Sequence, residues 1–116
     1  MKLALATAAL VMLVGAPAEA SAPARLQVVA REFRFVLSRP SLKAGPAIVE
    51  LVNFGQDAHD LRMRRIGGTR VYGLRILRPG ERAQLRLKLR PGRYLLWCSV
   101  ANHRALGMRA RLVVRR

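Results

Sequence analysis

The residue types that bind soft metal ions are concentrated near the end of the chain. Within eleven positions stand the only cysteine, Cys98, one of the two histidines, His103, and a methionine, Met108. The second histidine, His59, lies far upstream. Thiolate, imidazole and thioether are the ligand types that copper prefers, and a blue copper centre combines two His, one Cys and a weak Met ligand. These four residues are therefore the candidate metal ligands.

Each of these residue types has a commoner explanation when it stands alone. A single cysteine is usually buried and inert, and a methionine that opens a strand usually fills the core. A histidine after a loop is more often a surface residue. Zinc also binds His and Cys, but it forms closed tetrahedral sites in which thioether is not a usual ligand. Taken together, the four residues favour copper over zinc and over a metal-free domain.

The start of the chain has the pattern of an export signal. It combines a basic residue, Lys2, an apolar run at 3–14 and the small-x-small triplet Ala18-Glu19-Ala20, which predicts cleavage before Ser21. The run is shorter than the roughly 20 residues of a spanning helix, although an uncleaved anchor is the alternative. We expect no transmembrane segment in the mature chain and a periplasmic, extracellular or cell-envelope location. The expected division is a signal peptide at 1–20 and one domain at 21–116.

The charge of the chain is strongly unbalanced. It has 22 Lys and Arg against 6 Asp and Glu, a formal net charge of +16, and the basic residues are spread over nearly every segment. Such a charge attracts anionic partners and makes association slower at high salt. We expect an acidic redox protein as partner, with an anionic envelope surface as a further candidate. Nucleic acid is not expected, because few aromatic residues are present for base stacking and no recognition motif occurs.

The hydrophobic pattern is that of short strands and not of helices. The clearest alternation is at 82–90, where aliphatic residues face one side and basic or polar residues the other. The Ala-Arg-Glu step at 30–32 breaks the alternation of the first strand and is expected to be a bulge. Gly and Pro turns separate these segments, so the sequence predicts an all-β sandwich. The expected strands are 26–37, 47–52, 61–64, 71–77, 82–90, 94–98 and 108–114.

Several motifs resemble the cupredoxin family, which includes plastocyanin and azurin. The resemblance covers roughly residues 33–114 and implies a Greek-key β-sandwich of about seven to eight strands that holds one type 1 copper ion. It implies His59, Cys98 and His103 as equatorial ligands and Met108 as the axial ligand. The motifs are Val52-Asn53-Phe54-Gly55 with His59-Asp60-Leu61, then Leu77-Arg78-Pro79-Gly80-Glu81, Pro91-Gly92-Arg93-Tyr94 and Cys98-x4-His103-x4-Met108.

Two residues near the candidate ligands have open roles in this comparison. Asp60 stands where many cupredoxins have Asn, and its carboxylate either tethers the ligand loop or faces water. Asn53 is interpreted as a turn residue. Backbone N–H groups from the Asn53 and Ser99 regions are the candidate donors to the Cys98 sulfur.

The resemblance implies a single-electron carrier and not an enzyme. The chain has no carboxylate pair, nucleophile–base set or phosphate-binding loop, and four protein ligands leave no open copper position for a substrate. A small apolar patch around His103, formed with Ala101, Ala105, Leu106 and Gly107, is the expected docking surface for electron exchange. The alternatives are copper carriage, storage or sensing without electron transfer, and a metal-free basic β-sandwich that acts as a binding module.

Overall fold

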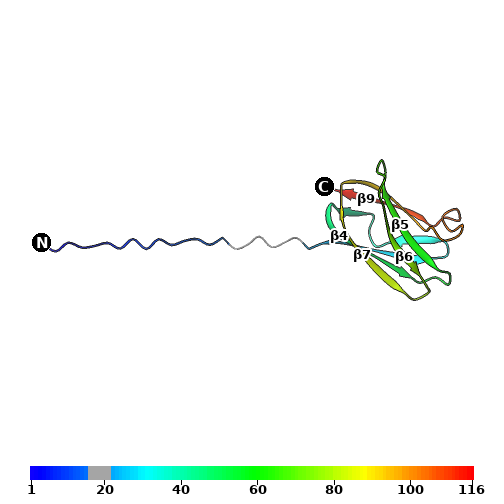
Figure 1. Ribbon diagram of the computed structural model, residues 1–116, viewed down its shortest axis with the longest axis horizontal. Coiled ribbons are helices and arrows are strands. Elements are labelled where there is room, and N and C mark those ends of the chain that lie inside the picture. Colours follow the sequence, from blue (N-terminus) through cyan, green and yellow to red (C-terminus); the bar gives the residue numbers. More distant parts are fainter. Residues whose placement is uncertain (16–21) are drawn as a thin grey trace.

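The computed structural model describes residues 1–15 and 22–116, and these form nine β-strands and no helix (Figure 1). The strands pair into two sheets, one of four strands in the order β2-β1-β4-β7 and one of five in the order β3-β9-β8-β5-β6. The strands are β1 (Ala24–Arg31), β2 (Arg34–Leu37), β3 (Ser41–Lys43), β4 (Gly45–Asn53), β5 (His59–Arg65), β6 (Val71–Leu77), β7 (Arg82–Leu89), β8 (Gly92–Trp97) and β9 (Arg109–Arg115).

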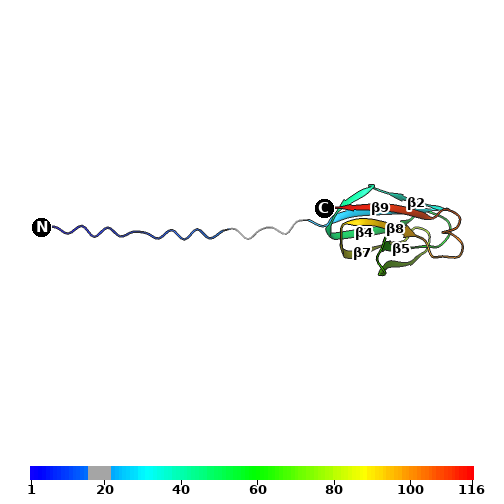
Figure 2. The same ribbon diagram turned by 90° about the horizontal axis from the view of Figure 1, so that it is seen from above.

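The expected all-β sandwich is confirmed. β1 and β4 pair in parallel, as do β3 and β9, and the other pairs are antiparallel. Five of the eight connections between consecutive strands cross from one sheet to the other, while those of β1-β2, β5-β6 and β8-β9 stay within a sheet. This is the Greek-key arrangement expected. The loop between β8 and β9 lies at the end of the sandwich opposite the C-terminus (Figure 2). This end carries the candidate metal centre.

The structure has nine strands where seven to eight were expected, and the difference has two sources. The segment 26–37 is not one bulged strand: β1 and β2 are a hairpin, with Glu32 and Phe33 at its turn. The expected bulge at 30–32 is therefore wrong, because the break in alternation marks a reversal of the chain. The additional short strand β3 is held by parallel pairing with β9, which its local sequence does not encode.

Alternating side chains of both sheets fill one hydrophobic core. In β1, Leu26, Val28 and Ala30 point inward, while β4 is buried along most of its length. The core continues without a break into Cys98 and Met108. Because Cys98 and Met108 belong to the packed core of the sandwich, the core holds these two candidate ligands in position.

The first 15 residues form no helix or strand, and their side chains are exposed. None of the segments that the structure describes forms a helix with the length and apolarity needed to cross a membrane. The expected cleavage site at Ala18-Glu19-Ala20 lies outside the described residues, and the division at 20/21 stays a prediction.

Candidate metal centre

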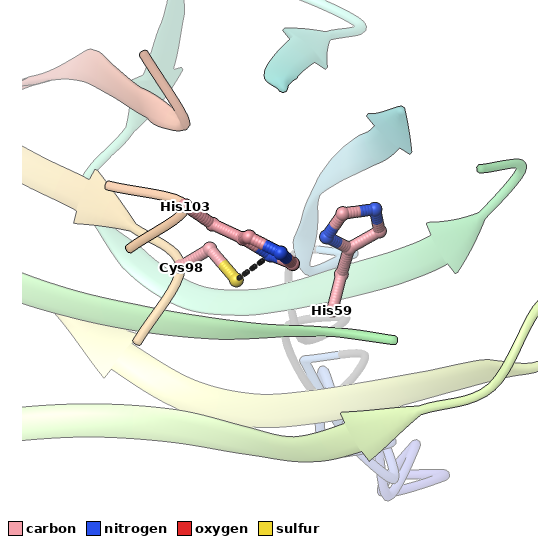
Figure 3. A group of neighbouring side chains, drawn as sticks. All are labelled: His59, Cys98 and His103. Atoms are coloured by element: carbon pink, nitrogen blue, oxygen red, sulfur yellow. Dashed lines mark hydrogen bonds between the residues drawn. The ribbon is translucent and has the colours of Figure 1, made fainter. Parts of the chain in front are cut away.

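Three predicted ligands meet at the end of the sandwich (Figure 3). His59 opens β5, Cys98 directly follows β8, and His103 lies in the loop that leads to β9. One ligand atom of each lies within 4.8 Å of the other two, and all three residues are buried. The Cys98 Sγ is 3.7 Å from His103 Nδ1, and the two imidazole centroids are 5.0 Å apart. This group can bind a metal ion.

Met108, the fourth predicted ligand, is the last residue of this loop before β9. Its side chain is fully buried in the core cluster that contains Cys98. Its backbone N–H donates to the His103 carbonyl at 3.0 Å, and its carbonyl accepts the Cys98 N–H at 3.1 Å. The loop is therefore closed by hydrogen bonds between the three predicted ligand residues that it carries.

The His59 ring shows that this group fits a metal. Its Nδ1 is buried and has no hydrogen-bond partner among the residues that the structure describes, while Nε2 lies 3.1 Å from Glu32 Oε1. One nitrogen of the ring faces His103 and Cys98 (Figure 3). A buried polar atom without a partner is costly, and a cation bound between the three side chains would take up this lone pair.

Each imidazole has one nitrogen near the cluster and the other near a carboxylate. For His103, Nδ1 lies toward Cys98 and Nε2 lies 3.7 Å from Asp57 Oδ2. For His59, the carboxylate is that of Glu32. The backbone N–H groups of Asp57 and Gln56, together with the His59 ring, hold the pKa of Glu32 at about 2, against an ordinary value of 4.5. Glu32 is therefore ionised at neutral pH.

Burial raises the pKa of the Cys98 thiol above its ordinary value of 9.0, against the opposing effect of the Asp60 and Val100 backbone N–H groups. The thiol is consequently protonated at neutral pH in the metal-free protein, and metal binding has to displace its proton. Val100 belongs to the Ser99 region that was expected to supply a donor to the sulfur. The Asn53 N–H is not such a donor, because it bonds to the Glu81 carbonyl at 3.0 Å.

Asp60 tethers the ligand loop and does not face water. It is 1% exposed, and its carboxylate accepts hydrogen bonds from the Ser99 backbone N–H at 2.7 Å and from the Ser99 hydroxyl. Of the two roles open at the level of the sequence, the structure selects the first.

Sequence reasoning missed the residues that brace the centre. Asn53 is more than a turn residue: its buried amide donates to the carbonyls of Asp57 at 2.8 Å and Leu77 at 3.0 Å, and so fixes the loop before His59. The Phe33 ring lies 4.8 Å from the His103 ring, centroid to centroid. The sequence does contain one feature that could have drawn attention to Glu32: acidic residues are rare in this basic chain, so each of them is a candidate for a specific role.

Comparison with solved structures finds the same fold. An auracyanin reduced with Na-dithionite, from the photosynthetic bacterium Roseiflexus castenholzii, superposes with a TM-score of 0.66 at 14% identity, covering 83% of this chain and 100% of that one. Auracyanin A, a "blue" copper protein from the green thermophilic photosynthetic bacterium Chloroflexus aurantiacus, gives 0.66 at 16% identity, covering 81% and 100%. A reduced amicyanin variant gives 0.58 at 18%, covering 82% and 86%.

The sequence itself carries no such match. No protein-family model matches the chain, and no curated protein matches it. The resemblance to the cupredoxins is thus confirmed at the level of the fold.

Proposed function

We propose that this protein is an exported mononuclear type 1 copper protein that carries single electrons. His59, Cys98 and His103 are the equatorial ligands in this proposal, and Met108 is the axial ligand. The observation that carries it is the buried triad of ligand atoms within 4.8 Å, with the unpartnered His59 Nδ1 among them. The fold shared with a protein described as a "blue" copper protein supports it.

The donor set favours copper over the other metals that bind His and Cys. A thiolate and a thioether in one site are soft ligands, whereas zinc usually forms closed sites without thioether. Copper, when bound, supplies one-electron exchange between its two oxidation states. The chain contributes a site that stays in place: Cys98, His103 and Met108 lie on one hydrogen-bonded loop, and the core packs beneath it. Fixed ligands keep the reorganisation that accompanies electron exchange small.

The surroundings fit a carrier better than an enzyme. All four candidate ligands are buried, and His103, at 6% exposure, is the most exposed of them. Around it, Leu106 is 51% exposed, and Ala101 and Ala105 are exposed as well. With the half-buried Gly107, these residues form the expected patch beside the least buried of the four ligands, and in this proposal a partner exchanges electrons there.

A second surface favours an acidic partner. On the outer face of the five-stranded sheet, Arg62 and Arg109 flank Trp97, and Arg64 and Arg111 flank Leu95 in the next row. Arg104 stacks over Trp97 at 4.7 Å and, with Leu95, Arg109 and Arg111, lines a groove of about 530 Å³. Arg104, Arg109 and Arg111 make no ion pair with any carboxylate that the structure describes. Guanidinium groups in such rows are suited to carboxylates of a partner.

Export rests on the sequence of the first 20 residues, and association with an anionic envelope surface rests on the net charge of +16. Both are part of the proposal. Amino-terminal sequencing of the protein from the native cell tests cleavage before Ser21, and fractionation of the same cells locates it.

Addition of Cu(II) to the purified full chain tests the metal centre. We expect an intense thiolate-to-copper band in the visible spectrum that bleaches reversibly on reduction. Cys98→Ala should remove the band while circular dichroism still shows a β-protein. Copper bound without the band would instead indicate copper carriage, storage or sensing. If no copper binds, the remaining candidate function is that of a metal-free basic β-sandwich that acts as a binding module.

Charge reversal tests the arginine surface. The double variant Arg109→Glu/Arg111→Glu changes the face described above, and Arg86→Glu/Lys88→Glu makes the same change in charge on β7 of the other sheet. With poly-L-glutamate as the acidic probe, the first variant should lose more affinity than the second, and the difference should shrink as salt is added. Equal losses would mean that net charge alone, and not this face, attracts acidic partners.

A further inference from the structure

We infer that Glu32 is a positioning residue of the metal centre, which fixes the His59 imidazole in the tautomer that leaves Nδ1 free for a metal. Glu32 lies in the turn between β1 and β2 and thus belongs to the four-stranded sheet, whereas His59 opens a strand of the five-stranded sheet. The inference rests on the metal site of the proposed function but not on electron transfer.

The Glu32 carboxylate is held where it is. Its Oε1 accepts the backbone N–H groups of Gln56 at 2.7 Å and Asp57 at 2.6 Å, in addition to its contact with His59 Nε2 at 3.1 Å. Gly55 packs directly against it: a Cβ at this position would lie 2.4 Å from Oε1. An oxygen fixed by two backbone donors gives the ring a rigid partner.

The partners of the two His59 nitrogens decide where its proton lies. A neutral imidazole has one N–H and one lone pair. Nε2 faces a carboxylate, which only accepts hydrogen bonds, while Nδ1 is buried and finds no partner within the described ranges 1–15 and 22–116. The proton therefore lies on Nε2, and Nδ1 presents its lone pair to the space shared with Cys98 and His103. A carboxylate that accepts the outer N–H of a metal-binding histidine fixes the tautomer and raises the basicity of the ligand.

The same turn also braces the second histidine. Phe33, the neighbour of Glu32, lies 4.8 Å from the His103 ring, centroid to centroid. Its backbone oxygen packs against Gly107 in the ligand loop. One two-residue turn of the four-stranded sheet thus contacts both imidazoles.

The placement of the acidic residues adds an electrostatic reason. Five of the six Asp and Glu residues lie among the described residues, and three of them, Glu32, Asp57 and Asp60, surround the candidate centre. The other two, Glu50 and Glu81, pair with arginines. In a chain of net charge +16, the general field opposes a bound cation, and nearby carboxylates offset it.

The first test uses the metal-free full chain. Nitrogen-15 chemical shifts of the His59 ring should show a protonated Nε2 and an unprotonated Nδ1. Glu32→Ala should mix the two tautomers, while Glu32→Gln, which retains an acceptor oxygen, should preserve the native one. A proton on Nδ1 in the unaltered protein would overturn the inference, whether or not any variant folds.

The second test measures the affinity for Cu(II) by competition with a chelator. Glu32→Ala should weaken binding by about 10- to 100-fold, with partial recovery in Glu32→Gln. Glu50→Ala is the matched control, because Glu50 also contacts a side-chain donor, the Gln27 amide, but at a partly exposed position in β4 of the same four-stranded sheet, outside the candidate centre. Equal affinities in Glu32→Ala and Glu50→Ala would overturn the inference. A chain that binds no copper at all would refute the proposed function, while the tautomer measurement would still report on Glu32.

Discussion

The Asp60 carboxylate accepts the backbone N–H of Ser99 at 2.7 Å and so joins the residue after His59 to the residue after Cys98. The Ser99 hydroxyl donates to the other carboxylate oxygen, and Arg62 Nε lies 3.6 Å from it. The two residues are 39 positions apart in the chain. The start of β5, which carries His59, is thus linked directly to the loop that follows Cys98, and the distance between His59 and Cys98 does not depend on core packing alone.

Asp60→Ala should therefore lower the free energy of unfolding. The change leaves the part-buried Ser99 N–H without its acceptor, and a loss of this kind costs about 1 kcal/mol. We expect the loss in urea unfolding of the metal-free protein and a broader visible band in the copper-loaded protein. Asp60→Asn retains one acceptor oxygen and should recover part of both.

Glu81→Ala is the control for this change. The Glu81 carboxylate likewise accepts a backbone N–H, that of Arg78 at 2.7 Å, but in a turn that is partly exposed. Water replaces a lost partner there, so the cost should be smaller and the visible band unchanged. Equal costs in the two variants would show that burial of the Asp60 contact adds nothing.

Gly55→Ala should destabilise the protein through the Glu32 carboxylate, which supplies the three atoms nearest to the added methyl group. The added methyl group would lie 2.4 Å from Glu32 Oε1 and 2.8 Å from Oε2, so the carboxylate has to move. Its movement weakens the hydrogen bonds that Oε1 accepts from the Gln56 and Asp57 N–H groups, so the free energy of unfolding should fall. The check is a double-mutant cycle in urea: in a Glu32→Ala background, Gly55→Ala should cost almost nothing. An undiminished cost in that background would place the strain elsewhere.

Much of the fold follows from local sequence. The strict alternation at 82–90 predicted a strand, and the structure has β7 (Arg82–Leu89) there. The Gly and Pro turns separate the strands as expected. Residue type alone predicted that His59, Cys98 and His103 lie together. Few kinds of side chain bind a soft metal, and this chain has only one Cys and two His.

The bracing of the site could not be predicted in this way. Glu32 and His59 are 27 positions apart and lie in different sheets, so no periodicity connects them. The turn at Glu32 was interpreted as a bulge, because a bulge and a tight reversal both break alternation and only pairing distinguishes them. Contacts between sheets depend on how the sandwich closes, which single-strand patterns do not contain.

Tyr94→Phe should change how stability depends on alkaline pH. The Tyr94 hydroxyl donates to the Arg90 carbonyl at 2.9 Å and accepts the Arg90 N–H at 3.1 Å. Burial raises the pKa of Tyr94 above its ordinary value of 10.0. A raised pKa in the folded state contributes stability that is present below pH 10 and is lost as the pH rises through the folded value. The phenylalanine variant should lose about 1 kcal/mol at pH 7 and decline less above pH 10.

Urea unfolding at a series of pH values between neutral and strongly alkaline checks this expectation. Tyr72→Phe is the control, since the Tyr72 ring lies beneath Arg70 and is partly exposed. If both variants follow the same pH curve as the unaltered protein, the Tyr94 hydroxyl does not govern the alkaline decline.

Met108→Leu should separate the packing role of this residue from a metal-ligand role. Leucine has nearly the same volume and is apolar, so the free energy of unfolding of the metal-free protein should fall by less than about 1.5 kcal/mol. The thiolate band should persist, because Cys98, His59 and His103 are unchanged. The reduction potential should rise, since the axial ligand tunes it and loss of a thioether donor destabilises the more positively charged oxidation state. Met63→Leu, in the buried part of β5, is the matched control and should leave the potential unchanged. Equal potentials in the two variants would mean that Met108 only fills the core.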